Sequence, residues 1–196
     1  MKFRLYYQGP LHSSQGDYYA PATDPKGNHK HNVRMVFHDQ LKRLWETHSG
    51  LKSITSSGMP LPTVLATKYQ SCGINWVPLV NGMLSLHCHL DIVFLRRDRP
   101  GSIFKTRDLD NRLKTLFDAL RRPIEMNQMQ GVTIDRGNSP YYVLLENDDL
   151  ISGVTVETDD LLDPPSEAGD DDSYVRVLIT VTTRTHTVTF ENIGLS

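Results

Sequence analysis

The chain has 196 residues, of which 22% are charged and 38% hydrophobic, and its formal net charge is −2. These values are typical of a globular domain, so they argue against general disorder, and the length suits one domain with its own core. No segment resembles a signal peptide or approaches the roughly 18 apolar residues of a membrane-spanning helix, so we expect a cytoplasmic protein without a membrane partner. Cys72 and Cys88 match neither a metal-ligand nor a disulfide pattern, and both are expected to be reduced.

The N-terminal third of the chain predicts one strand and one helix. Residues 2–7 alternate between polar and apolar types, which is typical of a strand, and residues 8–31 have the composition of a loop. In that loop, His29 and His31 flank a lysine, a pattern that favours a solvated or phosphate-contacting segment over a zinc site. Apolar residues then recur every three or four positions, so we expect Asn32 to cap a helix that ends near residue 48.

The central part of the chain predicts a β-hairpin. Residues 49–72 have a weak pattern and are expected to be irregular. Asn81-Gly82 then separates two strand-like runs, residues 76–80 and 84–95, and this dipeptide is a strong signal for a two-residue hairpin turn. The second run leads into a basic segment.

The remaining elements complete an α+β pattern. A second helix is expected from Asp108 or Asp110 to Pro123, and residues 122–147 are an insert of uncertain structure. The last elements expected are a strand at 154–157, an acidic flexible loop at 158–173 and a long strand at 174–185. We therefore expect one domain spanning residues 1–196, with a mixed or antiparallel sheet and two main helices packed on one face.

The second helix begins with closely spaced polar residues that suggest metal-ion chemistry. Asp108 and Asp110 are separated by one residue, so their side chains would lie on the same face of an extended chain. Asn111 follows, and Lys114 lies one helical turn beyond Asp110. Converging carboxylates repel one another unless a cation lies between them, and oxygen-only sites favour Mg²⁺, with Mn²⁺ as a substitute. Such ions commonly catalyse phosphodiester cleavage.

The charged residues are unevenly distributed. Between residues 157 and 172 there are eight carboxylates and no basic residue, whereas the segment around the second helix is basic. The candidate phosphate contacts are Arg96, Arg97, Arg99, Lys105, Arg107 and Arg112.

The segment Asp108-x-Asp110-Asn111-x-x-Lys114, which continues into Leu-Phe-Asp-Ala-Leu and is followed by Asp148-Asp149, resembles the RusA family of Holliday junction resolvases. The resemblance covers about 15 residues and the later acidic pair. It implies a homodimeric endonuclease that cleaves branched DNA, such as a four-way junction, with Mg²⁺ or Mn²⁺. It also implies that Asp108, Asp110 and Asp149 are the catalytic, metal-binding carboxylates and that Lys114 is the catalytic lysine, with Asp148 a weaker metal candidate.

The sequence differs from the family pattern at some positions. The family commonly has a glutamine two positions after its acidic pair, where this chain has Ile151, and residues 121–147 form a longer connection. Two alternatives therefore remain open: a related nuclease acting on flaps, single strands or RNA, for example in phage defence, and a non-catalytic nucleic-acid-binding protein of the same fold. A simpler alternative also exists for individual residues, because Asp110 could cap the helix and pair with Lys114 at the i,i+4 spacing.

Overall fold

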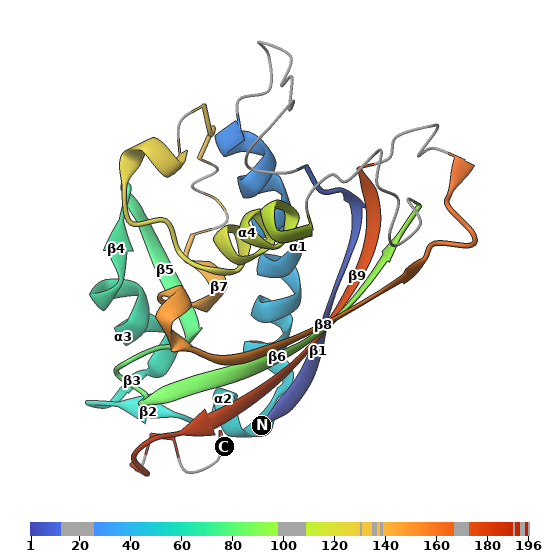
Figure 1. The fold of residues 1–196 in the computed structure, drawn as a ribbon. Coiled ribbons are helices and arrows are strands. Elements are labelled where there is room, and N and C mark those ends of the chain that lie inside the picture. Colours follow the sequence, from blue (N-terminus) through green and yellow to red (C-terminus); the bar gives the residue numbers. More distant parts are fainter. Residues whose placement is uncertain are drawn as a thin grey trace.

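The computed structural model describes residues 1–12, 26–97, 109–129, 131–134, 137, 139–166, 173–189, 191–192 and 195 (Figure 1). Its main sheet has four strands in the order β1, β9, β6, β8. Their bounds are Lys2–Pro10, Tyr174–Thr185, Leu86–Arg96 and Ile151–Asp160, respectively. β9 pairs antiparallel with both β1 and β6, whereas β8 runs parallel to β6. The fold is thus α+β with a mixed main sheet, as the sequence predicted.

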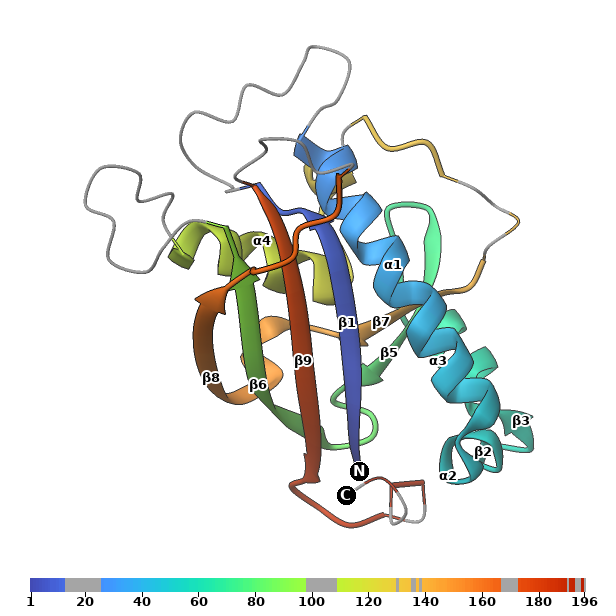
Figure 2. The same ribbon diagram turned by 90° about the vertical axis from the view of Figure 1, so that its right-hand side faces the viewer.

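Alternating side chains of the main sheet build its core. In β6, Cys88, Leu90, Ile92 and Phe94 are buried, while the residues between them are partly exposed. This period of two places one face of the sheet against the helices α1 (Lys26–Thr47) and α4 (Leu109–Leu120). Figure 2 looks onto the opposite face, where no helix lies in front of β6, β9 or β8. Both main helices therefore pack on one side, as predicted.

α1 lies between the main sheet and a second, three-stranded sheet. This second sheet consists of β4 (Gln70–Ser71), β5 (Ile74–Val80) and β7 (Tyr141–Leu145), with β5 and β7 parallel. Phe37 on α1 contacts Tyr7 of β1, with ring centroids 6.1 Å apart. His38, one residue further along the helix, contacts Tyr141 of β7 at 5.3 Å. The helix is therefore buried on two sides.

Short elements fill a region that was expected to be irregular. They are the helices α2 (Ser49–Lys52) and α3 (Leu61–Lys68), with β2 (Thr55–Ser56) and β3 (Met59–Pro60) forming a small antiparallel pair. Leu61 and Leu65 of α3 are buried. The prediction of irregular structure at 49–72 was wrong because these elements are too short to show a clear period.

Two other local predictions were wrong. α1 begins at Lys26, so Asn32 lies inside the helix and does not cap it. β5 and β6 do not pair with each other, although Ser85 N–H donates to Gly82 O at 3.1 Å in the turn between them. β5 joins the second sheet and β6 the main sheet, so the turn is present but the hairpin is not. β7, which lies next to β5, was not in the predicted order of elements.

The predicted acidic flexible loop begins later than expected. β8 extends to Asp160, so residues 158–160 form strand backbone paired with β6. Leu161 is buried, and its N–H donates to Arg96 O at 2.7 Å. Residues 167–172 of this loop lie outside the described part of the chain. Within the described part, no helix is both long and apolar enough to span a membrane.

The connection from β6 to β8 carries the candidate site residues. A parallel pair of strands needs a crossover connection, and here it contains α4, the short helix η1 (Met126–Met129), β7 and the single turn η3 (Asp148–Leu150). Asp110 lies at the start of α4, and Asp149 lies on η3, which leads directly into β8.

Candidate functional site

The N-terminal turn of α4 presents Asp110 and Lys114 to solvent. Asp110 is an acidic residue in the first helical turn, where the helix dipole favours a negative charge. Its Oδ2 lies 2.8 Å from Lys114 Nζ across one helical turn, and both side chains are exposed. The simpler i,i+4 pairing is therefore present in the structure. Asp108 lies outside the described residues.

The acidic segment 146–149 contains carboxylates in two different settings. Glu146 Oε2 accepts a hydrogen bond from Gly82 N–H at 2.8 Å, so it fixes the turn between β5 and β6. Asp148 and Asp149 are exposed on η3. Asn147 caps this turn, with its Oδ1 accepting from Asp148 N–H at 2.9 Å. Asp148 and Asp149 are thus accessible, whereas Glu146 has a structural contact.

Backbone contacts join the C-terminal end of α4 to this acidic segment. Arg122 N–H donates to Leu145 O at 3.1 Å, and Arg121 forms a bridge with the same residue. Because an α-helix rises about 1.5 Å per residue, Asp110 lies roughly 16 Å along the helix from Arg121. Asp110 is therefore at the N-terminal end of α4, whereas the backbone contact with Leu145, next to the acidic segment, is at the C-terminal end.

No metal cluster is formed by the residues that can be placed. In the described part of the chain, which excludes Asp108, no three His, Cys, Asp or Glu side chains are grouped so that they could hold a metal ion. The predicted convergence of Asp108, Asp110 and Asp149 remains a prediction.

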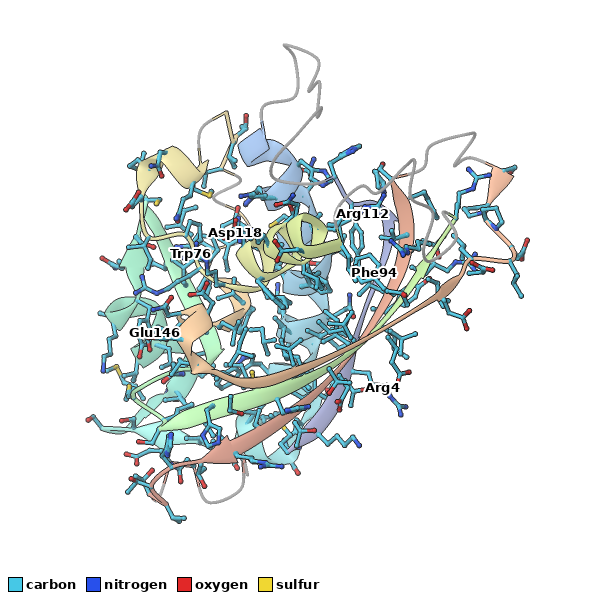
Figure 3. The ribbon with its side chains drawn as sticks, in the orientation of Figure 1. Arg4, Trp76, Phe94, Arg112, Asp118 and Glu146 are labelled. Atoms are coloured by element: carbon cyan, nitrogen blue, oxygen red, sulfur yellow. The ribbon has the colours of Figure 1, made fainter. Side chains whose placement is uncertain are left out.

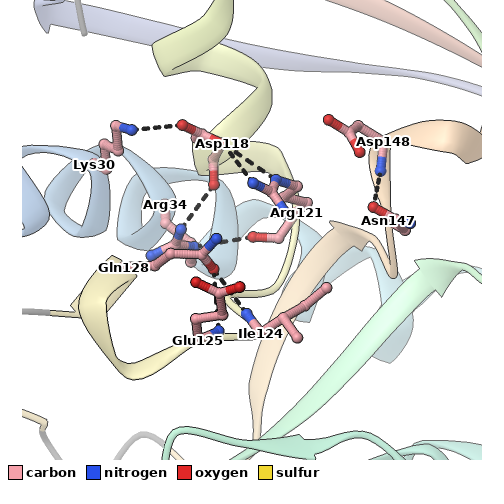
Figure 4. A network of polar contacts seen from close by, with 9 residues as sticks. All are labelled: Lys30, Arg34, Asp118, Arg121, Ile124, Glu125, Gln128, Asn147 and Asp148. Carbon is pink, nitrogen blue, oxygen red and sulfur yellow. Dashed lines mark hydrogen bonds and ion pairs between the residues drawn. The ribbon is translucent and has the colours of Figure 1, made fainter.

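The carboxylate with the most polar contacts on α4 is Asp118, which the sequence did not single out as a site residue. Its Oδ2 lies 2.5 Å from Lys30 Nζ on α1, and its Oδ1 lies 2.8 Å from Arg121 Nη2 (Figure 4). Burial alone would raise the pKa of this carboxyl, but the hydrogen bonds and charges of Lys30 and Arg121 outweigh it, so the pKa is lowered. Asp118 lies eight residues after Asp110 and four after Lys114, on the same side of the helix.

Arg34 on α1 binds the C-terminal end of α4 through hydrogen bonds to backbone carbonyls. Its buried guanidinium donates to Asp118 O at 2.7 Å and to Arg121 O at 3.2 Å, which satisfies carbonyls in the last turn of the helix. The guanidinium carbon also lies 5.8 Å from the centre of a Trp76 ring. Burial lowers the pKa of Arg34 to about 10, which leaves it cationic at neutral pH. The sequence contains one indication of this contact: Arg34 lies among apolar residues in the segment predicted as the first helix.

Histidines that were expected in a loop are part of the core. His29 and His31 lie on α1 and are buried, so the prediction of a solvated or phosphate-contacting segment was wrong. Burial, together with the nearby Arg34 and His38, lowers the pKa of His31 to about 4. The intervening Lys30 points instead to Asp118 (Figure 4).

The candidate phosphate contacts fall into three groups. Arg96 and Arg97 lie at the end of β6 and are partly exposed. Arg112 is only 1% exposed, on the buried side of α4 (Figure 3), and it is not available to an external phosphate in this structure. The rest of this set lies outside the described residues: Arg99, Lys105 and Arg107.

Comparisons with family models, curated proteins and solved structures found no match to this chain. The resemblance to the RusA family therefore depends on the motif residues and their spacing alone.

Proposed function

We propose that this protein is a metal-dependent endodeoxyribonuclease that cleaves branched DNA, such as a four-way junction. The observation that carries this proposal is the segment Asp108-x-Asp110-Asn111-x-x-Lys114 at the start of a helix, with Asp149 later in the chain. Asp110, Lys114 and Asp149 are all exposed, which supports the proposal because a phosphodiester must reach them.

Carboxylates are the type of donor that a hard divalent cation prefers, although the described residues do not place Asp110 and Asp149 in a group of three that could hold one. Carboxylate oxygens are preferred ligands of Mg²⁺ and Mn²⁺, and the accessible Asp110 and Asp149 have oxygens available for such an ion. Asp108, Asp110 and Asp149 would hold it, with Asp148 a weaker candidate. When bound, Mg²⁺ supplies an activated water for attack on phosphorus and balances the charge that builds on the phosphate.

Lys114 would stabilise negative charge at the reacting phosphate. Its contact with Asp110 keeps the carboxylate and the ammonium next to each other before DNA binds. With DNA present, the ammonium can donate to a non-bridging phosphate oxygen or to the departing 3′ oxygen, where negative charge develops.

DNA would be held mainly through its phosphates. Arg96 and Arg97, together with Arg99, Lys105 and Arg107 from the following segment, supply cations that bind backbone without reading sequence. We leave the buried Arg112 out of this set. A homodimer would place two active sites on one branched substrate, so that two strands could be cut in one encounter.

Cleavage of defined substrates tests the proposal directly. A four-way junction, a flap, a linear duplex and an RNA duplex are incubated with the protein in Mg²⁺ or in EDTA. We expect the junction to be cleaved only with Mg²⁺ or Mn²⁺, and Asp110→Asn and Asp149→Asn to abolish cleavage. Asp39→Asn, which removes an exposed carboxylate on α1, is the matched control and should cleave normally. Cleavage of RNA or flaps alone would point to the related nucleases, and no cleavage by the folded protein would overturn the proposal.

A further inference from the structure

The face of the main sheet that points away from the helices has a distinct pattern of side chains. The strand register places Tyr6, Leu178, Val93 and Glu157 in one row across β1, β9, β6 and β8. In Figure 2 this face is turned to the viewer, and the segment after β8 crosses only its upper end. Arg4 also points away from the helices, whereas Phe94 points toward them (Figure 3).

The centre of this face is apolar and exposed. Tyr6 is 44% exposed and Leu178 is 38% exposed, and they are direct neighbours on β1 and β9. Val93 continues the row on β6. A solvated sheet face usually carries polar side chains, whereas this face has adjacent large apolar residues at its centre, as interaction surfaces often do.

The charges on this face are divided between its two halves. β1 and β9 carry only basic charges on this face, and β6 and β8 carry only carboxylates besides the histidines His87 and His89. The basic residues are Lys2, Arg4, Arg176 and Arg184. The acidic residues are Asp91, Glu157 and Asp159.

We propose that this sheet face binds the same face of a second copy of the chain. A twofold axis parallel to the strands places β1 of one copy over β8 of the other, so the basic half of each sheet meets the acidic half of its partner. The same rotation places Leu178 opposite the partner's Val93, which covers both apolar rows. A nucleic acid would be repelled by the acidic half of this face.

The edges of the sheet do not offer a comparable dimer contact. Gln40 on α1 bonds both backbone groups of Tyr6 at the β1 edge. The β8 edge ends in Asp159 and Asp160, whose charges oppose the pairing of two such edges. Packing face to face is therefore the arrangement that the sheet supports.

This inference extends the homodimer of the proposed function, but it is tested without DNA. Sedimentation equilibrium of the full chain should show a dimer. Leu178→Asp should raise the dimer Kd by about 100-fold or more, because it places a charge in the apolar centre. Val36→Asp, which alters an equally exposed apolar residue on α1, is the matched control and should remain dimeric. Circular dichroism and melting temperature show whether each variant is folded.

A charge exchange tests the orientation of the two copies. Under this rotation Arg4 lies in the row next to the partner's Glu157, so the two side chains meet diagonally. Arg4→Glu alone and Glu157→Arg alone should each raise the Kd by about tenfold, and the double variant should restore most of the affinity. A monomeric wild type, or Leu178→Asp that dimerises as tightly as the wild type, would overturn the inference. A wild-type dimer that is weakened by Leu178→Asp but does not cleave DNA would support this interface and overturn the nuclease proposal instead.

Discussion

The side-chain amide of Gln40 on α1 forms hydrogen bonds with both backbone groups of Tyr6 on β1. Gln40 Nε2 donates to Tyr6 O at 2.7 Å, and Tyr6 N–H donates to Gln40 Oε1 at 2.9 Å. The glutamine thus takes the position of a peptide group in a neighbouring strand. It closes the edge of the sheet at this point and ties α1 to β1.

Gln40→Leu should reveal this role. Both hydrogen bonds are lost, and because the site is exposed, water replaces part of them, so we expect a loss of about 1 kcal/mol in the free energy of unfolding. The open strand edge should also increase aggregation near the melting temperature. Denaturant unfolding and light scattering measure the two effects, with Lys42→Leu on the exposed side of α1 as the control. Equal behaviour of the two variants would show that the Gln40 contact is unimportant.

Asp118→Asn tests the link between α1 and α4. The variant loses its charged contacts with Lys30 and Arg121, so we expect it to be less stable by about 1–3 kcal/mol at neutral pH. The folded pKa of Asp118 lies below its ordinary value of 3.8, so its contribution is complete above that pH and is lost as the pH falls further. Wild type and variant should therefore converge in stability in strong acid. A constant difference at all pH values would contradict this account.

His31→Phe tests the buried imidazole. The folded pKa of about 4 lies below the ordinary value of 6.5, so between these values the unfolded chain binds a proton that the folded protein does not. Stability of the wild type should fall as the pH decreases from 6.5 to 4, with a slope approaching one proton from this residue. The variant keeps an aromatic ring beside Tyr141 and should show a shallower slope. Urea titrations across this range measure the difference, and parallel slopes would count against it.

Asp110→Asn separates a catalytic role from a structural one. The i,i+4 pair with Lys114 and the favourable position at the helix start are both exposed, so their loss should cost less than about 1 kcal/mol. Cleavage should nevertheless be abolished, and the rise in melting temperature on adding Mn²⁺ should shrink. Lys114→Met should lower cleavage while retaining the Mn²⁺ effect. Retained cleavage by purified Asp110→Asn would refute the catalytic assignment.

Replacing Arg96, Arg97 and Arg99 with Ala tests the phosphate contacts. Each lost contact should reduce the slope of log affinity against log salt by about one, and affinity should fall equally for all DNA sequences. Arg43→Ala on the exposed side of α1 serves as the control and should leave the slope unchanged. An unchanged slope in the triple variant would show that these arginines do not contact DNA.

Helices and strands in which apolar residues repeat regularly over many positions were predicted well from the sequence. The last strand was expected at residues 174–185 and is observed as Tyr174–Thr185. The second helix was expected from Asp108 or Asp110 to Pro123 and is observed as Leu109–Leu120. In both elements, the apolar residues whose spacing predicts the helix or strand also pack in the core. Local and tertiary preferences therefore agree.

Pairing and site geometry could not be obtained in the same way. Asn81-Gly82 correctly indicated a turn, but a turn does not determine the partners of the strands it joins, and β5 finds its partner more than 60 residues later in β7. Likewise, Lys30 and Asp118 meet because α1 and α4 pack together, which no local spacing reveals. Asp118 lies within the run Leu-Phe-Asp-Ala-Leu but was not predicted as a site residue, and only the packing of the two helices shows what its carboxylate binds.

The position of β9 in the sheet has a consequence for synthesis of the protein. β9 lies between β1 and β6 and is the last of the described strands to be synthesised, so Phe3 acquires its strand partner only after Val181 has been made. On the ribosome, the two strands synthesised earlier therefore emerge with unpaired edges and an incomplete core. Such long-range pairing slows folding and prolongs exposure to aggregation. We therefore expect the nascent chain to be prone to aggregation until β9 has emerged.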